Sequence, residues 1–465
     1  MKSFFYLPAI IVIGWCIIFN SSAFGQYAQQ WSIPYQKAGA VMPATVLKMQ
    51  AVGDHIYLLG TVQGDNVAEE DFLLLKLDRS GNIIWEQIYT GPGDYHDIPA
   101  DMAFDNQGNI YVTGLSYQSA VGVDGSDYWT MKHSPDGSVQ WTATHTSEPG
   151  HGDEPCGIEV WNNMVFVSGK SVHVAGFATA EDYHSEVYNT ITGKRIWKHS
   201  WNGAGDDRRN YPKDMTLDAG GNMIIVGKSS HPNYDYSTVR YKWDTVYVSL
   251  DSIKIVLVFD WERYFNGSGD ALDDAYAVVT NSDGDIYITG ESWSSEGRQD
   301  ITTVKYDKFG NLKWTHSMNG TNNNHDLPIG IALDSEENVI VIGYLWNLGS
   351  AEDYCTIKYT PGGEMLWTTA YWNAAGHTNF PKDFVLDTED NIFITGDGGE
   401  MSQMYIRKLN TEGNLAWESF VVDDDGQQIF GQGQAITVDD DGNIYIAGIN
   451  ILKINELTIT MFKKM

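Results

Sequence analysis

The sequence has little cysteine and little positive charge, and both shortages narrow the class of protein. Only three cysteines occur in 465 residues, too few for a disulfide framework, so Cys156 and Cys355 are expected to be free thiols and a large core must stabilise the fold. Lys and Arg number 29 against 61 Asp and Glu, a net charge of −32. This balance argues against a nucleic-acid partner and allows cations to be attracted.

Long hydrophobic runs are also missing, except at the N-terminus. The stretch "FFYLPAIIVIGWCIIF" follows Lys2 and precedes the small-residue segment "AFG", a pattern typical of a secretory signal. We therefore predict a signal peptide at residues 1–25 and one domain at 26–465, with no transmembrane span after signal removal. A retained anchor is the alternative, although the run is shorter than the ~20 residues that a span needs. Location in the periplasm, at the cell surface or outside the cell follows from this prediction.

Familiar catalytic and metal-binding motifs are absent as well. The sequence contains no HExxH, no zinc-type Cys/His spacing, no P-loop and no GxSxG. The segment "DDDGN" at 439–443 has the start of a calcium loop but lacks the later Glu of an EF-hand, and a hairpin turn is the better interpretation. We predict no catalytic residue and no cofactor, with calcium as the one possible ion.

One short motif recurs through the whole chain. It takes forms such as "GNIYVTG", "GDIYITG" and "DNIFITG", in which β-branched and aromatic residues indicate a buried strand. Turn signals such as "DNQGN" precede it. The motif ends on eight glycines, namely Gly60, Gly114, Gly169, Gly227, Gly290, Gly343, Gly396 and Gly448.

A second motif follows each glycine, in forms such as "DYWTMKH" and "DYCTIKY", and then a turn leads to a tryptophan. Each unit is therefore four antiparallel strands, which cannot bury both sheet faces alone, whereas radial repetition buries them. We predict an all-β fold, a β-propeller of eight four-stranded blades. A seven-bladed ring is the alternative if the irregular third unit forms no blade.

The last unit lacks the tryptophan, but the N-terminal segment "YAQQWSIPY" supplies one at Trp31. The N-terminal strand is therefore predicted to complete the C-terminal blade and close the ring. The eight tryptophans are expected to pack between blades. Aspartates that begin the third strand of six units are expected to make structural hydrogen bonds. These are Asp71, Asp127, Asp182, Asp235, Asp300 and Asp353.

The meander places the uniform turns on one face and the longer, varied loops on the other, where function is more often found. On that variable loop face, connectors carry acids and histidines that could ring the axis mouth, although Asp also serves turns for backbone reasons. Loops after the glycines carry aromatic rings that could stack on sugars or pack between blades. The candidate ligand-binding residues are Asp94, His96, Asp97, His151, Asp153, Asp206, Asp270, His325, Asp326, His377, Tyr117, Tyr234, Trp293 and Trp346.

The fourth unit has a longer second hairpin than its neighbours. Its segment "IKIVLVF" is apolar in a polar setting, and an exposed segment of this kind indicates a partner or an aggregation hazard. We expect residues 246–256 to protrude and dock on a partner. The alternative is that the hairpin simply covers the rim of its blade.

The repeat resembles the bacterial SBBP β-propeller repeat, as carried by "GDYHDIPADMAFDNQGNIYVTGLS" and "GSGDALDDAYAVVTNSDGDIYITGES". That resemblance implies an exported binding or scaffold protein and seven blades, where we count eight. A weaker likeness to quinoprotein dehydrogenase propellers rests on "TITGKRIW" and implies a vicinal cysteine pair and a calcium-bound quinone. No adjacent cysteines occur here.

Two functions follow as hypotheses. The first is a non-enzymatic exported propeller that binds or scaffolds a protein, peptide or polysaccharide on its variable loop face. The second is a polysaccharide-acting hydrolase or lyase with an Asp/His site at the axis mouth. A pocket in which carboxylates and histidines converge would favour the enzyme.

Overall fold

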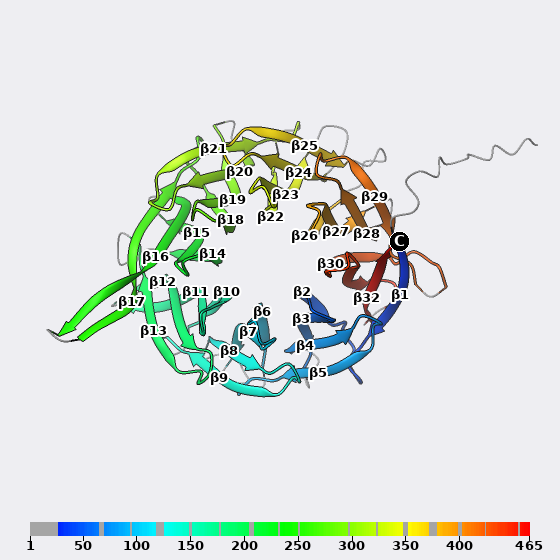
Figure 1. The fold of residues 1–465 in the computed structure, drawn as a ribbon, viewed down its shortest axis with the longest axis horizontal. Coiled ribbons are helices and arrows are strands. Elements are labelled where there is room, and N and C mark those ends of the chain that lie inside the picture. Colours follow the sequence, from blue (N-terminus) through cyan, green and yellow to red (C-terminus); the bar gives the residue numbers. More distant parts are fainter. Residues whose placement is uncertain are drawn as a thin grey trace, which may run out of the picture.

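Eight four-stranded antiparallel sheets form a ring in the computed structural model (Figure 1). The structure describes residues 27–64, 69–93, 95–117, 125–147, 151–175, 178–203, 209–230, 233–249, 252–295, 298–321, 324–346, 352–371, 379–398, 402–423, 425–453 and 456–465. The predicted signal segment lies outside them. The eight-bladed propeller is confirmed, and the irregular third unit forms a complete blade, so the seven-bladed alternative is wrong.

Each blade runs from an inner to an outer strand. Blade 1 holds β2 (Thr45–Val52), β3 (His55–Gln63), β4 (Glu70–Asp78) and β5 (Ile83–Tyr89). Blade 2 holds β6 (Asp97–Phe104), β7 (Ile110–Tyr117), β8 (Ser126–His133) and β9 (Val139–His145). Blade 3 holds β10 (Glu154–Trp161), β11 (Met164–Ala175), β12 (Ala178–Asn189) and β13 (Arg195–Trp201). Blade 4 holds β14 (Asn210–Leu217), β15 (Met223–Ser230), β16 (Tyr234–Ser249) and β17 (Ser252–Phe265).

The second half of the ring repeats this order. Blade 5 holds β18 (Asp273–Thr280), β19 (Ile286–Trp293), β20 (Gln299–Tyr306) and β21 (Leu312–Met318). Blade 6 holds β22 (Leu327–Leu333), β23 (Val339–Trp346), β24 (Glu352–Tyr359) and β25 (Met365–Tyr371). Blade 7 holds β26 (Pro381–Leu386), β27 (Ile392–Gly398), β28 (Gln403–Leu409) and β29 (Leu415–Phe420). Blade 8 holds β30 (Gly431–Val438), β31 (Ile444–Asn450), β32 (Glu456–Lys464) and β1 (Tyr27–Tyr35).

The ring closes through the N-terminal strand, as predicted. Strand β1 pairs antiparallel with β32, with Trp31 opposite Met461. The Trp31 indole Nε1 donates a hydrogen bond of 3.2 Å to the Arg79 carbonyl in blade 1. Sequence-distant ends thus share one blade, which ties the two termini of the fold together.

Five other tryptophans of the outer strands make the same contact between blades. The indoles of Trp85, Trp141, Trp261, Trp314 and Trp367 each donate to a turn carbonyl of the next blade, at 2.9–3.2 Å. Their predicted role in packing between blades is confirmed at these positions.

The motif glycines are required by close packing rather than by backbone conformation. At all eight, an added Cβ would meet a carbonyl oxygen of the adjacent inner strand at 1.9–2.4 Å. In four blades it would also meet a tyrosine hydroxyl of the preceding blade, as at Gly290 beside Tyr236. Glycine therefore lets the inner strand and the neighbouring blade approach together.

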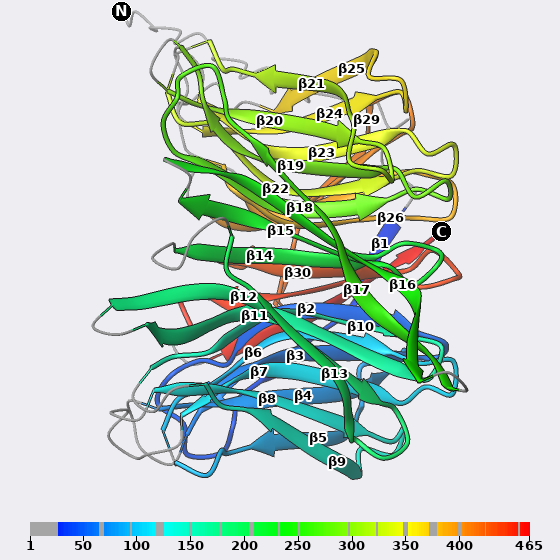
Figure 2. The same ribbon diagram turned by 90° about the vertical axis from the view of Figure 1, so that its left-hand side faces the viewer.

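The two faces of the ring differ as the meander requires. Figure 2 shows the ring from the side, with the connecting loops of one kind gathered on each face. The β14–β15 and β16–β17 turns belong to one face, here called the hairpin face, and the loops after the motif glycines to the other. No helix long and apolar enough to span a membrane occurs among the described residues.

Candidate functional site

Three of the predicted aspartates on the variable loop face are buried, and their carboxylates bond to backbone amides. Asp326 is fully buried, and its carboxylate accepts the amides of Gly320 at 2.6 Å and Trp346 at 2.7 Å. Asp153 accepts the amides of Ser147 and Val172 in the same way. Asp97 accepts the Gly91 amide. These carboxylates brace the connectors against the sheet, which is a structural task.

Burial and neighbouring negative charges both raise the pKa of aspartates on this face. Burial, with a minor contribution from Asp300, raises the pKa of Asp326 to about 6. Burial, with Asp273 and Asp270 adding like charge, raises the pKa of Asp235 to about 7. The six aspartates that begin third strands are all buried, and Asp127 accepts a hydrogen bond of 2.8 Å from the Thr146 hydroxyl.

The predicted histidines and rings contact one another in small groups rather than forming one ring about the axis. Tyr117 lies edge-on to Tyr95, with centroids 5.2 Å apart, and His96 completes that group. Tyr234 packs on Tyr211 at 6.0 Å. Trp293 lies 6.4 Å from His325, whose imidazole is hydrogen-bonded to Gln299.

The remaining candidates are dispersed. Asp270 is exposed and held by the Asn266 side chain, 2.8 Å away, and His151 is half-buried in the connector before β10. Asp94, Asp206 and His377 lie outside the described residues. Their ligand-binding role therefore stays a prediction.

One pocket on this face contains a predicted residue. It measures about 340 Å³ and lies between blades 4 and 5, lined by Trp293 and by small polar groups. The polar lining comes from Asn266, Ser268, Ser292, Ser294, Thr315 and Ser317. It holds an indole and neutral hydrogen-bonding groups without a carboxylate or an imidazole, so it supplies no acid–base pair.

Sequence reasoning missed a group of acids on the inner strands. Asp101, Asp214 and Asp383 each accept an inner-strand amide of the next blade, at 2.8–3.1 Å. Lys48 forms an ion pair of 2.5 Å with Asp101. Burial raises the pKa of Asp214 and of Asp383 to about 7. The signal was present as Pro-x-Asp in "PADM", "PKDM" and "PKDF".

The predicted protrusion of the fourth blade is confirmed. Strands β16 and β17 have 16 and 14 residues, against 8 and 7 for the matching strands of blade 5. Figure 1 shows this hairpin projecting outward beyond the ring. It also redirects a packing contact, because the Trp197 indole now donates to the Leu257 carbonyl of β17 at 2.8 Å.

An apolar groove lies beside the base of this hairpin, at the junction of blades 3 and 4. Two pockets of about 430 and 460 Å³ share Met164, Trp243 and Ile255. This groove is lined by Trp161, Asn162, Met164, Val187, Lys194, Arg195, Ile196, Trp197, Gly220, Trp243, Ile255, Val256 and Leu257. Ile255 is 70% exposed and Ile196 is 53% exposed.

The register of the strands explains why the groove is apolar. Val187 lies opposite Trp197, where six other blades place Lys or Arg opposite their tryptophan. Four of those lysines donate to a turn carbonyl of the next blade. In blade 4 the long hairpin replaces the turn that would accept this hydrogen bond. In blade 3, Val187 takes the place of the lysine or arginine.

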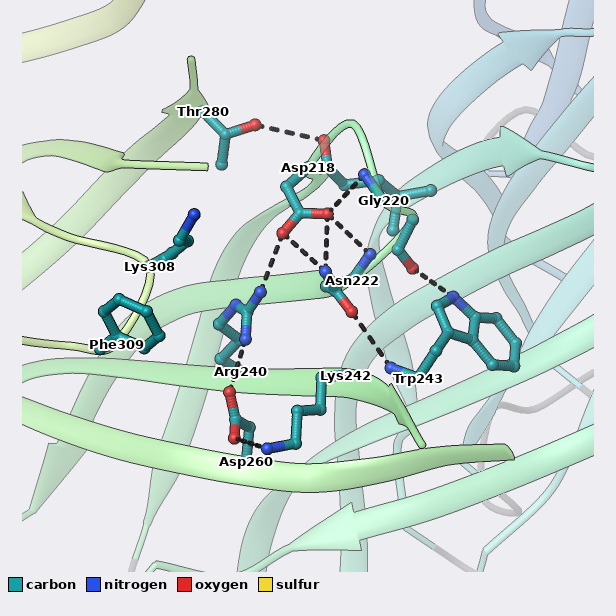
Figure 3. A network of polar contacts seen from close by, with 12 residues as sticks. Asp218, Gly220, Asn222, Arg240, Lys242, Trp243, Asp260, Thr280, Lys308 and Phe309 are labelled. Atoms are coloured by element: carbon teal, nitrogen blue, oxygen red, sulfur yellow. Dashed lines mark hydrogen bonds and ion pairs between the residues drawn. The ribbon is translucent and has the colours of Figure 1, made fainter. Parts of the chain in front are cut away.

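A buried polar network fixes the base of the hairpin (Figure 3). Arg240 is 6% exposed and joins Asp218 at 2.9 Å and Asp260 at 2.5 Å. The Trp243 amide donates to Asn222 and its indole to the Gly221 carbonyl at 2.9 Å. Trp243 is thereby held in place, stacked toward Trp161 with centroids 6.2 Å apart. The groove is therefore preorganised rather than a product of loose side chains.

The groove also carries positive charge at its edge, although the Arg195 guanidinium is already paired with buried Glu186. Lys194 and Arg195 line it, and neither Asp nor Glu does. Exposed apolar area beside Lys194 is what an apolar segment with a carboxylate needs for binding.

Comparison with known proteins identifies the repeat family. The model of the SBBP β-propeller repeat matches residues 88–118. An uncharacterized WD repeat-containing protein of Acanthamoeba polyphaga mimivirus is 22% identical over 390 residues, covering 70% of this chain. The chain spans only 26% of that relative's length.

Two solved structures are weakly similar. A protein of unknown function from Bacteroides caccae matches with 11% identity and a TM-score of 0.30, covering 60% of this chain and 82% of that one. Another, from Dyadobacter fermentans, matches with 9% identity and a TM-score of 0.41, covering 95% and 100%. These likenesses carry no functional information. The chain is an eight-bladed β-propeller that contains the SBBP β-propeller repeat.

Proposed function

We propose that this propeller is an exported, non-enzymatic binding protein whose groove receives an apolar, acidic segment of a partner protein. The observation that supports it most is the groove itself, with exposed Ile196 and Ile255 on a frame fixed by Arg240 and Trp243. A contiguous exposed apolar surface marks an interaction site more often than single exposed residues do.

The chemistry of the partner follows from the lining. Tryptophan and isoleucine side chains offer anchoring sites for one or two large apolar residues. Lys194 favours a carboxylate next to those anchors. The hairpin also offers the unpaired outer edge of β17, which an extended segment can join by strand addition.

Fluorescein-labelled peptides test the proposal through anisotropy. The panel pairs a Leu-Trp-Leu centre with flanking Glu or with flanking Lys, and a Ser-Gly-Ser centre serves as the apolar-free probe. Only the acidic apolar peptide should bind the wild-type protein. Ile255→Ser should weaken that binding by about tenfold, the loss expected from one buried aliphatic side chain.

Ile191→Ser is the matched control, because Ile191 is 77% exposed on the hairpin face and does not line the groove. Lys194→Glu should abolish the preference for acidic flanks. Equal weakening by the two isoleucine substitutions would overturn the proposal, as would deletion of residues 246–256 with unchanged binding and self-association.

A second candidate function rests on the pocket beside Trp293. An exposed face of an indole surrounded by hydroxyl and amide groups suits a sugar ring. Trp293→Ala should then remove binding to a glycan array while leaving the peptide assay unchanged. Turnover on that glycan panel, lost in His325→Ala, would favour the hydrolase or lyase alternative instead.

A further inference from the structure

A polar cluster replaces apolar core between blades 2 and 3. His145 ends β9 of blade 2, and His184 and Glu186 lie on β12 of blade 3. All three are buried, with Glu186 fully so. The strand pairing identifies the residue that corresponds to His145 in other blades. That residue is large and apolar or aromatic in six of them, namely Tyr89, Trp201, Phe265, Met318, Tyr371 and Phe420.

Glu186 departs in the same manner from five of the other blades, whereas blade 7 has Arg407 and blade 8 has Thr460 at this position. Blades 1, 2, 4, 5 and 6 place an aliphatic or methionine residue there, such as Val239 or Val304. The hydrophobic cluster at this junction is the smallest of the eight formed by described residues, with six buried members against 7 to 16 elsewhere. Folding alone therefore does not demand a charged triad here.

The three side chains converge on one point. The carboxylate oxygen Oε1 of Glu186 lies 3.3 Å from Nδ1 of His145 and 3.2 Å from Nε2 of His184. Three ligand atoms, one from each residue, lie within 4.8 Å of one another. Ligands bound to zinc at about 2.0–2.1 Å in a tetrahedron lie roughly 3.3 Å apart, which matches the two distances from the carboxylate.

Outer partners hold each of these groups. Nε2 of His145 is 3.1 Å from the Ser171 hydroxyl, and Nδ1 of His184 is 2.7 Å from the Ser200 hydroxyl. The Tyr188 hydroxyl donates to the other oxygen of Glu186. A serine hydroxyl accepts or donates equally well, so each imidazole can turn an unprotonated nitrogen toward the convergence point. Such support of the outer nitrogen is usual for metal-binding histidines.

We propose that His145, His184 and Glu186 bind a divalent transition-metal ion, zinc by chemical preference, and thereby link blades 2 and 3. Two imidazoles and one carboxylate suit zinc and leave a fourth position for water. The two rings are stacked, with centroids 3.8 Å apart and planes 10° apart. An ion lies in the plane of each ring that binds it, so one imidazole turns about its Cβ–Cγ bond on binding.

Arg195 accompanies that rearrangement. Its guanidinium donates to Glu186 Oε1 at 2.5 Å, the oxygen that faces the ion. The Arg195 side chain is 40% exposed, so it withdraws toward solvent when the ion takes its place. Calcium is disfavoured, because it prefers sites built wholly of oxygen ligands.

The test is a titration of chelator-treated protein with zinc chloride, followed by isothermal calorimetry, with cobalt chloride as the optical probe. The wild-type protein should bind one zinc ion that the variants lack, and cobalt should give the visible absorption of a tetrahedral site. Calcium chloride should give no comparable heat. Zinc should also raise the unfolding temperature, because it binds the native state alone.

The variants restore what other blades carry, so they are compatible with the fold. His145→Phe and His184→Thr together copy Phe265 and Thr302 and should remove the one-to-one site. Glu186→Gln keeps the side-chain shape and should weaken zinc by at least about tenfold. His316→Phe is the control, since His316 stacks on Tyr359 in blades 5 and 6.

Each outcome decides the proposal. Absence of stoichiometric zinc binding, or zinc binding that survives in both the double variant and Glu186→Gln, would overturn it. The wild-type protein could instead bind no zinc and lose stability below about pH 6. If the double variant lacks that loss, the cluster is a hydrogen-bonded histidine pair and not a metal site.

Discussion

Closure of the ring by β1 makes Trp31 a sensitive position for the stability of both chain ends. Its indole packs against Gly81, where an added Cβ would lie 3.1 Å from the ring, and it donates to the Arg79 carbonyl. Trp31→Ala removes a partly buried ring and one hydrogen bond, which costs about 2–4 kcal/mol of unfolding free energy. Trp31→Phe retains most of the ring and should cost about 1 kcal/mol.

Hydrogen exchange read by mass spectrometry locates the effect. Strand β32 is paired with β1 on one side, from Leu457 to Lys464, so Trp31→Ala should speed exchange in a peptide covering residues 456–465. A peptide covering β20 (299–306) in blade 5, three blades away around the ring (Figure 1), should be unaffected. Urea unfolding supplies the free energies. Unchanged exchange in the 456–465 peptide, with full loss of stability elsewhere, would refute the closing role of β1.

Three further predictions concern packing and titration. Gly290→Ala should lower the unfolding temperature, since its Cβ would lie 2.2 Å from a carbonyl oxygen, whereas Gly362→Ala meets only an ordinary contact at 3.6 Å; thermal unfolding of both variants checks this. Asp214 and Glu159 have folded pKa values of about 7, above their unfolded values of about 4. Their protonated forms therefore stabilise the fold at low pH, and that contribution is lost between about pH 4 and about pH 7; Asp214→Asn should flatten the fall in melting temperature over that range. Arg240→Met should cost about 3 kcal/mol in urea unfolding, because it leaves buried Asp218 without its cation, whereas Asp260 keeps Lys242; a loss below about 1 kcal/mol would contradict the role of the network.

The architecture was predictable because the same packing requirements recur in all eight units of the sequence. The motif glycine marks the close approach of an inner strand, as Gly290 does, and the outer-strand tryptophan marks the contact with the next blade. Trp31 was recognisable as the eighth tryptophan because the last unit lacked one. Each of these signals lies within one unit of sequence, where local spacing carries the information.

The proposed metal site was harder to predict, because its residues come from two different blades. His145 and His184 are stacked in space yet belong to different blades, and nothing in the local motif indicates their contact. The loop aspartates pose the opposite difficulty. Asp97, Asp153 and Asp326 have the composition of a ligand site, yet their carboxylates accept backbone amides. Residue type alone does not distinguish a carboxylate that braces a loop from one that faces a ligand.

The repeat itself offers a way to make that distinction. Seven other blades show what each position needs for folding, so a departure that costs apolar packing needs another cause. Asp97, Asp153 and Asp326 recur at equivalent positions and so belong to the fold. Glu186 and Val187, neighbours on β12, depart from the repeat in opposite senses, a carboxylate for an aliphatic residue and an aliphatic residue for a cation. Their side chains alternate across the strand, so one contributes to the proposed metal site and the other to the groove. Blade 3, the least regular unit in sequence, therefore carries the departures on which both proposals rest, and substitutions at Glu186 and Val187 should alter binding more than stability.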